Sequence, residues 1–322
     1  IPHCAFLGQI GGYAQSVAGP AMAAAIAYSL CRDPLVIFSS AAVGFAANSL
    51  GGAGGPLAVL FITIAAAECG RLVSKKTKVD IIVTPFVTIF VGGTLSILVA
   101  PYIGKLVGYV SDFIGWAALK APFVSGLIIS VVVGIALTLP ISSAAICAGL
   151  TLTGSIAAAG SSEGLAIAGG AAVAGCCAQM IGFAVISFRD NRWGGLLSQG
   201  IGTSMLQMPN IVRHPAIWLP PTLASAITGP LATCVFKMRM YGAAINSGMG
   251  TCGLCGLIGV WTGWVSPSEE AIAKGAEAIS ATGFDWLGLV LVAIVLPAIL
   301  APAINTVCRR LGWVKDGDLK LD

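Results

Sequence analysis

Long apolar runs, separated by short polar or charged stretches, recur along the whole chain. A helix that crosses a lipid bilayer needs about 20 mostly apolar residues. Six runs approach or exceed that length: Phe6–Leu30, Val79–Ile103, Pro122–Leu139, Gly164–Phe188, Ala216–Phe236 and Phe284–Val307. Two shorter runs, Pro34–Ser49 and Pro56–Arg71, are separated only by a glycine-rich stretch. This pattern predicts an all-α, polytopic transmembrane bundle with about 10 membrane segments.

Other apolar stretches are interrupted by polar and small residues. Ile141–Gly160, Trp193–Met208 and Tyr241–Trp264 have this pattern, which predicts broken or re-entrant helices. Irregular backbone at membrane depth is tolerated only where protein or a water-filled cavity shelters it. A fourth stretch, Gly104–Ala121, mixes charged with apolar and aromatic residues and predicts an interfacial amphipathic segment.

The composition supports a membrane location because too few charges are present to cover a water-exposed surface. Hydrophobic residues make up 57% of the 322 residues and charged residues 9%, and the mean hydropathy is +0.94. Soluble domains carry about 25% charged residues. We therefore expect a lipid-embedded domain over residues 1–322 with no soluble domain. No Lys/Arg run is longer than Lys75-Lys76, so no nucleic-acid partner is expected.

The basic residues are distributed unevenly between the two predicted sides of the membrane. If every apolar stretch crosses, only four of the 17 Lys and Arg residues fall on one side: Lys105, Lys120, Arg213 and Lys274. The positive-inside rule then predicts a cytoplasmic C-terminus.

An internal repeat is indicated by two similar glycine-rich motifs. Residues Gly44–Gly55 and Gly242–Gly253 share Gly, Ala, Asn, Ser, Gly and Gly at the same spacing. Transporters are often built from repeats whose broken helices hold the substrate. Repeat halves would span about residues 1–121 and 122–322. The alternative is chance similarity between membrane segments rich in small residues.

The Asn-Ser pairs of this repeat are the main candidates for solute binding. Asn48, Ser49, Asn246 and Ser247 lie beside glycines, which leave backbone N–H and C=O groups accessible. An asparagine amide both donates and accepts hydrogen bonds, as do the hydroxyls of a sugar or other polyol. The alternative role is hydrogen bonding between helices.

Two further groups of polar residues allow either a structural or a binding role. Glu68 lies three residues before Arg71, which predicts an ion pair on one helix face or a substrate-binding carboxylate. Gln207, Asn210 and His214 form a polar stretch between two apolar segments, as a loop cap or a cavity wall.

Catalytic chemistry has little support in the sequence. The spacing of Cys252 and Cys255 is that of a metal or redox pair, but no second pair accompanies it and the surroundings are apolar. Nucleotide-binding loops, zinc-protease motifs and nucleophile elbows are also missing. No catalytic residue, metal or cofactor is therefore expected.

Several stretches nevertheless resemble one family. They are Arg32–Phe38, Asn48–Gly55, Leu139–Ala145, Gly200–Gln207 and Asn246–Gly253. These resemble bacterial EIIC-like membrane subunits of the sugar phosphotransferase system, a family that includes the toxin-regulator protein PfoR. The resemblance covers nearly the whole chain.

The resemblance implies a homodimer in the bacterial inner membrane whose EIIC domain binds and carries a sugar. Separate cytoplasmic EIIA- and EIIB-like proteins would supply phosphate, so the chain would be at most the membrane part of a phosphotransferase complex. EIIC sites generally use a Glu and polar side chains around re-entrant hairpins, which makes Glu68, His214, Asn48 and Asn246 analogous candidates.

Two functions are compatible with these features. In the first, the chain is a transporter subunit that binds a sugar or similar small polar solute between the Asn-Ser motifs and exposes it alternately to each side. In the second, the chain is a membrane-embedded sensor or regulator with a transporter-like fold and no net transport.

Overall fold

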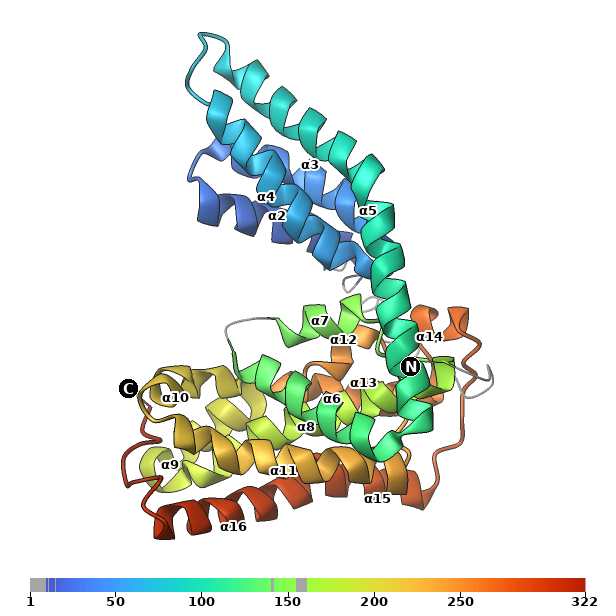
Figure 1. The fold of residues 1–322 in the computed structure, drawn as a ribbon, viewed down its shortest axis with the longest axis vertical. Helices are drawn as coiled ribbons and strands as arrows, with labels where there is room; N and C mark the ends of the chain where they lie inside the picture. Colours follow the sequence, from blue (N-terminus) through green and yellow to red (C-terminus); the bar gives the residue numbers. More distant parts are fainter. Residues whose placement is uncertain (1–9, 11, 15, 140–141, 155–160, 322) are drawn as a thin grey trace. The chain divides into compact units, whose positions relative to one another are not determined.

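The chain is almost entirely helical. The structure is a computed structural model that describes residues 10, 12–14, 16–139, 142–154 and 161–321, and no strand occurs among them. The all-α prediction is confirmed for this part of the chain. The helices form two compact units, Ile1–Tyr109 and Val110–Asp322, and the chain passes from one to the other within helix α5 (Figure 1). Each unit is described by itself below.

Small residues allow close helix packing in the first unit. It contains α2 (Ala18–Leu30), α3 (Pro34–Gly51), α4 (Gly55–Val73) and the first part of α5 (Asp80–Lys120). Its core includes Ala23, Ala47, Ala58 and Ala66, all fully buried. A Cβ atom on Gly44 would lie 2.4 Å from the Gly19 carbonyl oxygen, so α2 and α3 touch backbone to backbone.

The start of α3 is fixed by Asp33, in the loop after α2. Its side chain accepts a hydrogen bond of 2.9 Å from the Leu35 N–H and one of 2.5 Å from the Ser74 hydroxyl. The Lys75 ammonium lies 3.9 Å away. The Ser74 hydrogen bond is the main cause that lowers the pKa of Asp33 below its ordinary value, and burial opposes it. Asp33 therefore joins the α2–α3 loop to the α4–α5 loop.

Helix α5 contradicts one prediction. The stretch Gly104–Ala121 is not a separate interfacial segment, because Asp80–Lys120 forms one helix of 41 residues. Pro101 removes one backbone donor without ending the helix. The break comes at Ala121, where φ is −137°, as expected of a residue before proline. The charged residues in this stretch indicated an amphipathic surface, but none of them is a residue that ends a helix.

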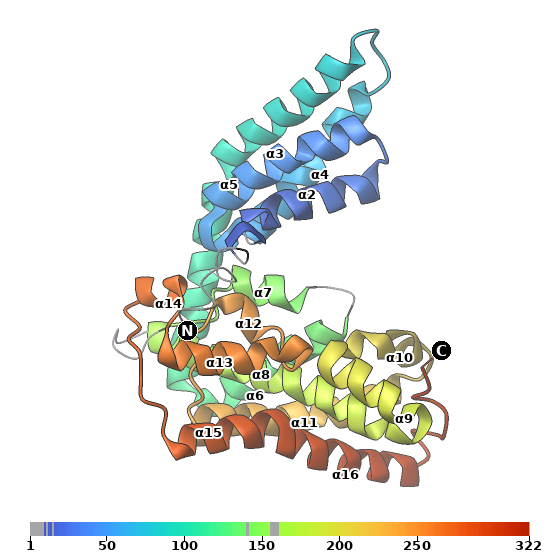
Figure 2. The ribbon, with the colours of Figure 1, turned by 180° about the vertical axis from the view of Figure 1, so that it is seen from behind.

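The second unit is built around α8 (Ser161–Ile186). Over the 18 residues that could cross a bilayer, 89% are buried inside the protein, as expected of a helix that is apolar on all faces. Helices α6 (Pro122–Thr138), α11 (Leu219–Pro230) and α16 (Leu296–Arg310) pack around it. Both views show α16 running alongside α11 (Figures 1 and 2).

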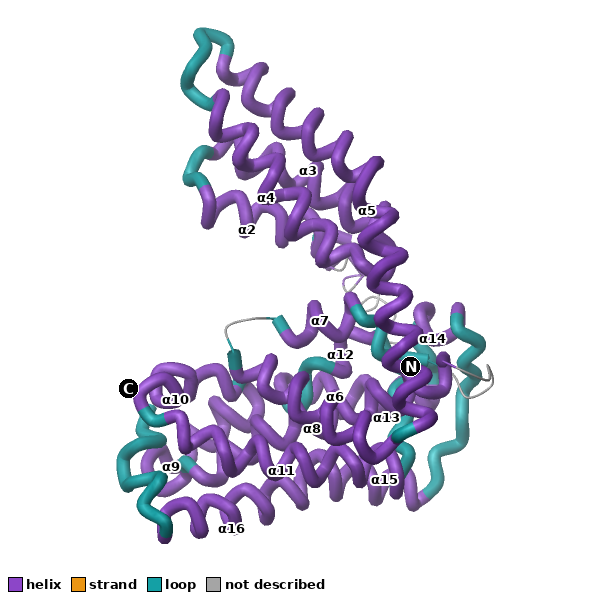
Figure 3. The backbone as a smooth tube through the Cα atoms, in the orientation of Figure 1, coloured by secondary structure: helices purple, strands orange, loops and turns teal. Residues whose placement is uncertain are grey.

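Short helices and irregular segments fill the rest of this unit. The predicted breaks in Trp193–Met208 and Tyr241–Trp264 are confirmed, and the break in Ile141–Gly160 is confirmed for residues 142–154, while the rest of that stretch lies outside the described residues. The remaining helices are α7 (Ser143–Gly149), α9 (Phe188–Leu197), α10 (Met208–Arg213), α12 (Ala244–Ser247), α13 (Cys255–Val265), α14 (Glu269–Ala273) and α15 (Gly283–Val290). Wide helical turns of the π type occur at Ser198–Gly202, Leu231–Val235 and Leu291–Val295. Figure 3 shows the long loop that joins α14 to α15.

Five described helices are long and apolar enough to cross a bilayer. They are Pro34–Gly51, Gly55–Val73, Asp80–Lys120, Ser162–Ile186 and Gly283–Arg310, and shorter apolar helices accompany them. These helices agree with a multi-pass membrane protein. The prediction of about 10 segments and the proposed repeat halves stay predictions.

Candidate functional site

The Asn246-Ser247 pair ends a very short helix, α12, at a sharp turn. Gly250 follows with φ of +53°, and Gly253 and Leu254 have φ of +52° and +59° before α13 begins. Gly52, which holds the position equivalent to Gly250 in the similar motif, has φ of +51°. A glycine with positive φ is thus common to both motifs, whereas the preceding helices differ greatly in length.

Helices α7 and α12 lie side by side, and contacts between Ser143 and Gly248 hold them together. The Ser143 hydroxyl donates a hydrogen bond of 2.7 Å to the Gly248 carbonyl. A Cβ on Gly248 would lie 2.4 Å from the Ser143 carbonyl oxygen. Ser142 caps α7 by accepting a hydrogen bond of 3.1 Å from the Ala145 N–H. The two short helices form one closely packed pair, called the α7–α12 pair below (Figure 1).

The Asn246 amide has unused hydrogen-bonding capacity. Its side chain is half-buried and packs against Gly259 of α13, where an added Cβ would lie 2.6 Å from the Asn246 Cβ. Among the described residues the amide has no hydrogen-bond partner. Ser247 differs, because it is buried and donates a hydrogen bond of 2.5 Å to the Ala244 carbonyl. Asn246 is therefore the group of this pair that is open to a solute.

A carboxylate lies beside this pair that the sequence did not single out. Glu270 Oε2 accepts a hydrogen bond of 3.0 Å from the Ala244 N–H, at the start of α12. Glu270 is exposed and lies in the first turn of the short helix α14. No spacing rule connects residues this far apart, so sequence reasoning could not place Glu270 near Asn246.

Lys274, at the end of α14, connects that helix to the irregular segment after α7. Its ammonium donates hydrogen bonds of 2.9 Å to the Thr151 carbonyl and 2.8 Å to the Thr153 carbonyl. Partial burial lowers the pKa of Lys274, while the charges of Glu270 and Asp112 oppose this shift. Thr153 in turn donates to the Met240 carbonyl at 2.9 Å. These hydrogen bonds hold the irregular backbone near the α7–α12 pair in place.

Helix ends also meet at Gln179, in the middle of α8. Its amide donates a hydrogen bond of 3.1 Å to Thr222 at the start of α11. Thr138, at the end of α6, lies 2.9 Å from the Ser204 hydroxyl and 3.4 Å from Gln179 Oε1. Gln179, Thr138 and Ser204 are fully buried. The sequence did not reveal this cluster, because each member is a single polar residue in an apolar run. Its side chains hydrogen-bond to one another, so we interpret the cluster as structural.

Gln207, Asn210 and His214 lie together, and they contact the C-terminal tail. Gln207 donates a hydrogen bond of 2.9 Å to the Leu319 carbonyl, and Asn210 donates one of 2.8 Å to the Lys320 carbonyl. His214 Nε2 lies 3.6 Å from Asp318. Leu319 itself is fully buried in the hydrophobic core. These three side chains therefore anchor the tail, and their role in solute binding stays a prediction.

The remaining candidates lie in the first unit. Asn48 is half-buried between α2 and α4, and a Cβ on Gly55 would lie 2.6 Å from its Oδ1. Ser49 is exposed. Glu68 pairs with Arg71 at 2.6 Å, which confirms the ion pair that the spacing predicted. The two Asn-Ser pairs thus belong to different compact units. In the described part of the chain, His, Cys, Asp and Glu side chains form no group of three that could hold a metal.

Comparison with known families decides the identity. Residues 1–321 match the family described as Phosphotransferase system, EIIC. The chain belongs to this family. This EIIC chain is therefore a membrane subunit of a sugar transporter, and the resemblance found in the sequence is confirmed. No curated protein and no solved structure matches the chain.

Membership of the EIIC family bears on the broken segments of the second unit. A transporter must shelter irregular backbone inside the membrane where it holds its substrate. In this EIIC chain the short helices α7 and α12, with the turn that follows Asn246, are irregular backbone.

Proposed function

We propose that this EIIC chain binds a sugar or a similar polyol at the α7–α12 pair, with Asn246 as its main polar contact. The observation that carries this proposal is the half-buried Asn246 amide, which has no hydrogen-bond partner among the described residues. A half-buried amide without a protein partner keeps its donor and acceptor groups available to a ligand or to water. A polyol hydroxyl can both donate to the amide and accept from it.

Glu270 complements Asn246 in this proposal. Its carboxylate is a strong acceptor for hydroxyl donors, and its hydrogen bond to Ala244 holds it at the start of the helix that carries Asn246. In the first unit, Asn48 and Ser49 hold the equivalent motif. We propose that pair as a separate polar contact for a solute within the first unit, because a glycine with positive φ recurs at the same spacing.

Transport in this proposal is completed by other proteins. The chain forms a homodimer in the bacterial inner membrane, with its C-terminus in the cytoplasm. Cytoplasmic EIIA- and EIIB-like phosphocarriers phosphorylate the arriving sugar. The family match supports the phosphocarrier partners, since EIIC subunits act within a phosphotransferase system, and the distribution of basic residues supports the cytoplasmic C-terminus. The family match also favours transport over the sensor alternative.

A thermal-shift screen of the purified protein in detergent tests the binding site. Sugars, polyols, sugar phosphates, nucleosides and small acids are compared, since a ligand that binds the folded state raises the melting temperature. We expect one polyol class to stabilise the protein in a saturable way. Asn246→Ala and Glu270→Gln should weaken this response, while the matched control Glu269→Gln should preserve it. A screen in which no polyol stabilises the protein would overturn the proposal.

A further inference from the structure

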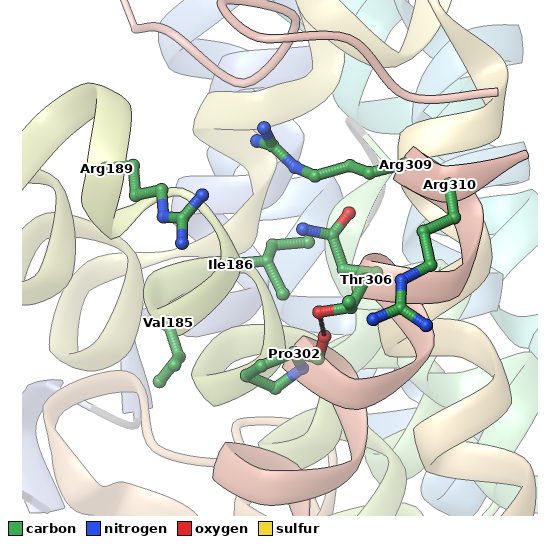
Figure 4. A pocket seen from close by; sticks show the side chains of 8 residues that line it. Val185, Ile186, Arg189, Pro302, Thr306, Arg309 and Arg310 are labelled. Carbon is green, nitrogen blue, oxygen red and sulfur yellow. Dashed lines mark hydrogen bonds between the residues drawn. The ribbon is translucent and has the colours of Figure 1, made fainter. Parts of the chain in front are cut away.

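A pocket distant in sequence from the Asn-Ser motifs opens between the end of α8, the start of α9 and the last turns of α16. Its volume is about 410 Å³, within the range of about 300–1,000 Å³ that is typical of small-molecule sites. Arg189 enters it from α9, and Arg309 and Arg310 enter from α16 on the opposite side (Figure 4). Asn305 and Thr306 line it between them.

The charges around this pocket leave two arginines available. Arg309 is paired with Asp316, and its Nη2 lies 4.0 Å from Asp190 Oδ2. Arg189 and Arg310 have no ion pair with any described residue. The three arginine side chains carry three positive charges, and the carboxylates of Asp190 and Asp316 supply two negative charges. The pocket therefore keeps a net positive charge. Guanidinium groups from opposite sides suit a compact anion with several acceptor oxygens.

Buried polar atoms in the same pocket are unsatisfied. Among the described residues, Asn305 Oδ1, Arg309 Nη2 and Asp190 Oδ2 are buried without a hydrogen-bond partner, and the last two form an ion pair with each other. The contact of 4.0 Å between Arg309 and Asp190 is too long for a hydrogen bond. Asn305 is only 6% exposed, so water reaches it poorly. A ligand in this pocket must accept hydrogen bonds from the two unpaired guanidinium groups, Arg189 and Arg310, and donate one to the Asn305 amide oxygen.

We propose that this pocket binds a polyol phosphate. Its phosphate oxygens accept hydrogen bonds from Arg189 and Arg310. A hydroxyl on the polyol part donates to Asn305 Oδ1. Two sources share this chemistry: a soluble sugar phosphate and the headgroup of phosphatidylglycerol. The inference does not depend on the Asn246 site, because it uses a different set of residues and does not require transport.

The competing explanation is that these arginines only fix the membrane orientation of the chain. Basic residues at cytoplasmic helix ends have that effect, and Arg309 and Arg310 in the last turn of α16 also stabilise its C-terminal dipole. Neither effect requires the arginines to share a pocket with a buried, unsatisfied amide, and neither predicts specific binding of a phosphate ester.

Binding is tested on the full purified chain with two kinds of probe. In the soluble arm, glucose 6-phosphate is compared with glucose and with inorganic phosphate by the shift in melting temperature. In the lipid arm, native mass spectrometry counts phosphatidylglycerol against phosphatidylcholine retained from mixed micelles. Both arms use the wild type, the variant Arg189→Gln/Arg310→Gln, and the control Arg213→Gln/Lys237→Gln, which removes two exposed charges elsewhere in the second unit.

We expect one phosphate ester to bind the wild type and the control, and to bind the Arg189→Gln/Arg310→Gln variant at least about tenfold more weakly. The arm in which binding occurs identifies the source. The inference is overturned if neither phosphate ester binds the wild type, or if binding is equal in the two double variants. Because Arg189 and Arg310 are exposed and unpaired among the described residues, their replacement should leave the fold intact.

Discussion

At the residue scale, several turns and helix contacts of the second unit require glycine, because a Cβ atom there would overlap a neighbouring segment. Gly250 shows this most clearly. Its φ of +53° disfavours any residue with a Cβ, and an added Cβ would lie 2.7 Å from that of Cys176 in α8. The turn after Asn246 therefore requires glycine for both its conformation and its contact.

Replacement of Gly250 by alanine should destabilise the protein. The left-handed backbone alone costs about 1–2 kcal/mol, and the contact with Cys176 adds to it. Gly194→Ala is the control, since nothing lies within 4 Å of a Cβ there. Detergent melting curves of both variants measure the effect. Equal melting temperatures for the two variants would contradict the tight turn.

Gln207 illustrates a polar residue whose position in the fold could not be predicted from the sequence. Its amide bonds the Leu319 carbonyl and, at 3.0 Å, the Gln199 side chain. Gln207→Ala should lower the free energy of unfolding by about 1–3 kcal/mol, because it leaves buried acceptors unpaired. The variant should still respond to the stabilising polyol. An unchanged melting temperature together with a lost response would instead place Gln207 in the solute site.

Local spacing explains which residue contacts were predictable. The Glu68–Arg71 pair follows from positions three apart on one helix face. The contacts of Glu270 with Ala244 and of Gln207 with Leu319 join distant parts of the chain. Only the tertiary fold creates them, so the sequence identified polar candidates without their partners.

At the element scale, the apolar pattern predicted most helices and failed where helix ends depend on context. The ends of α3 and α6 lie close to those predicted, because Asp33 with Pro34, and Pro122, are explicit start signals. Helix α5 runs through a stretch predicted to be separate, since charged residues do not themselves end a helix. Breaks inside apolar stretches were visible from their small and polar residues, although the exact ends of α7 and α12 were not.

The capping of α3 by Asp33 predicts a pH dependence. Its pKa is lower in the folded protein than its ordinary value of 3.8. The ionised carboxylate therefore stabilises the fold above that pH, and this contribution is lost as the pH falls below 3.8 through the folded value. The wild type should melt at a higher temperature than Asp33→Asn at neutral pH, and the difference should shrink in acid. A difference that stays constant down to the onset of acid unfolding would contradict the prediction.

At the scale of the whole molecule, apolar helices and the family match together establish a multi-pass membrane subunit. The distribution of basic residues adds an orientation. With most of the 17 Lys and Arg residues on one predicted side, the tail after α16 is expected in the cytoplasm.

A reporter fused after Leu321 checks this orientation. A fluorescent protein that matures only in the cytoplasm should fluoresce there, and alkaline phosphatase, which is active only outside, should be inactive at the same position. Insertion of the same reporters in the α14–α15 loop should give the opposite result. Active phosphatase at the C-terminus would reverse the predicted topology.

The most direct test of the central claim is solute movement across a membrane by the purified chain. Vesicles containing the reconstituted protein are loaded with the polyol that stabilises it, and exchange of the labelled polyol from outside is measured. The account predicts saturable exchange above that of empty vesicles, reduced by Asn246→Ala and preserved by Glu269→Gln. Binding without any exchange would contradict the transporter account and favour the sensor alternative.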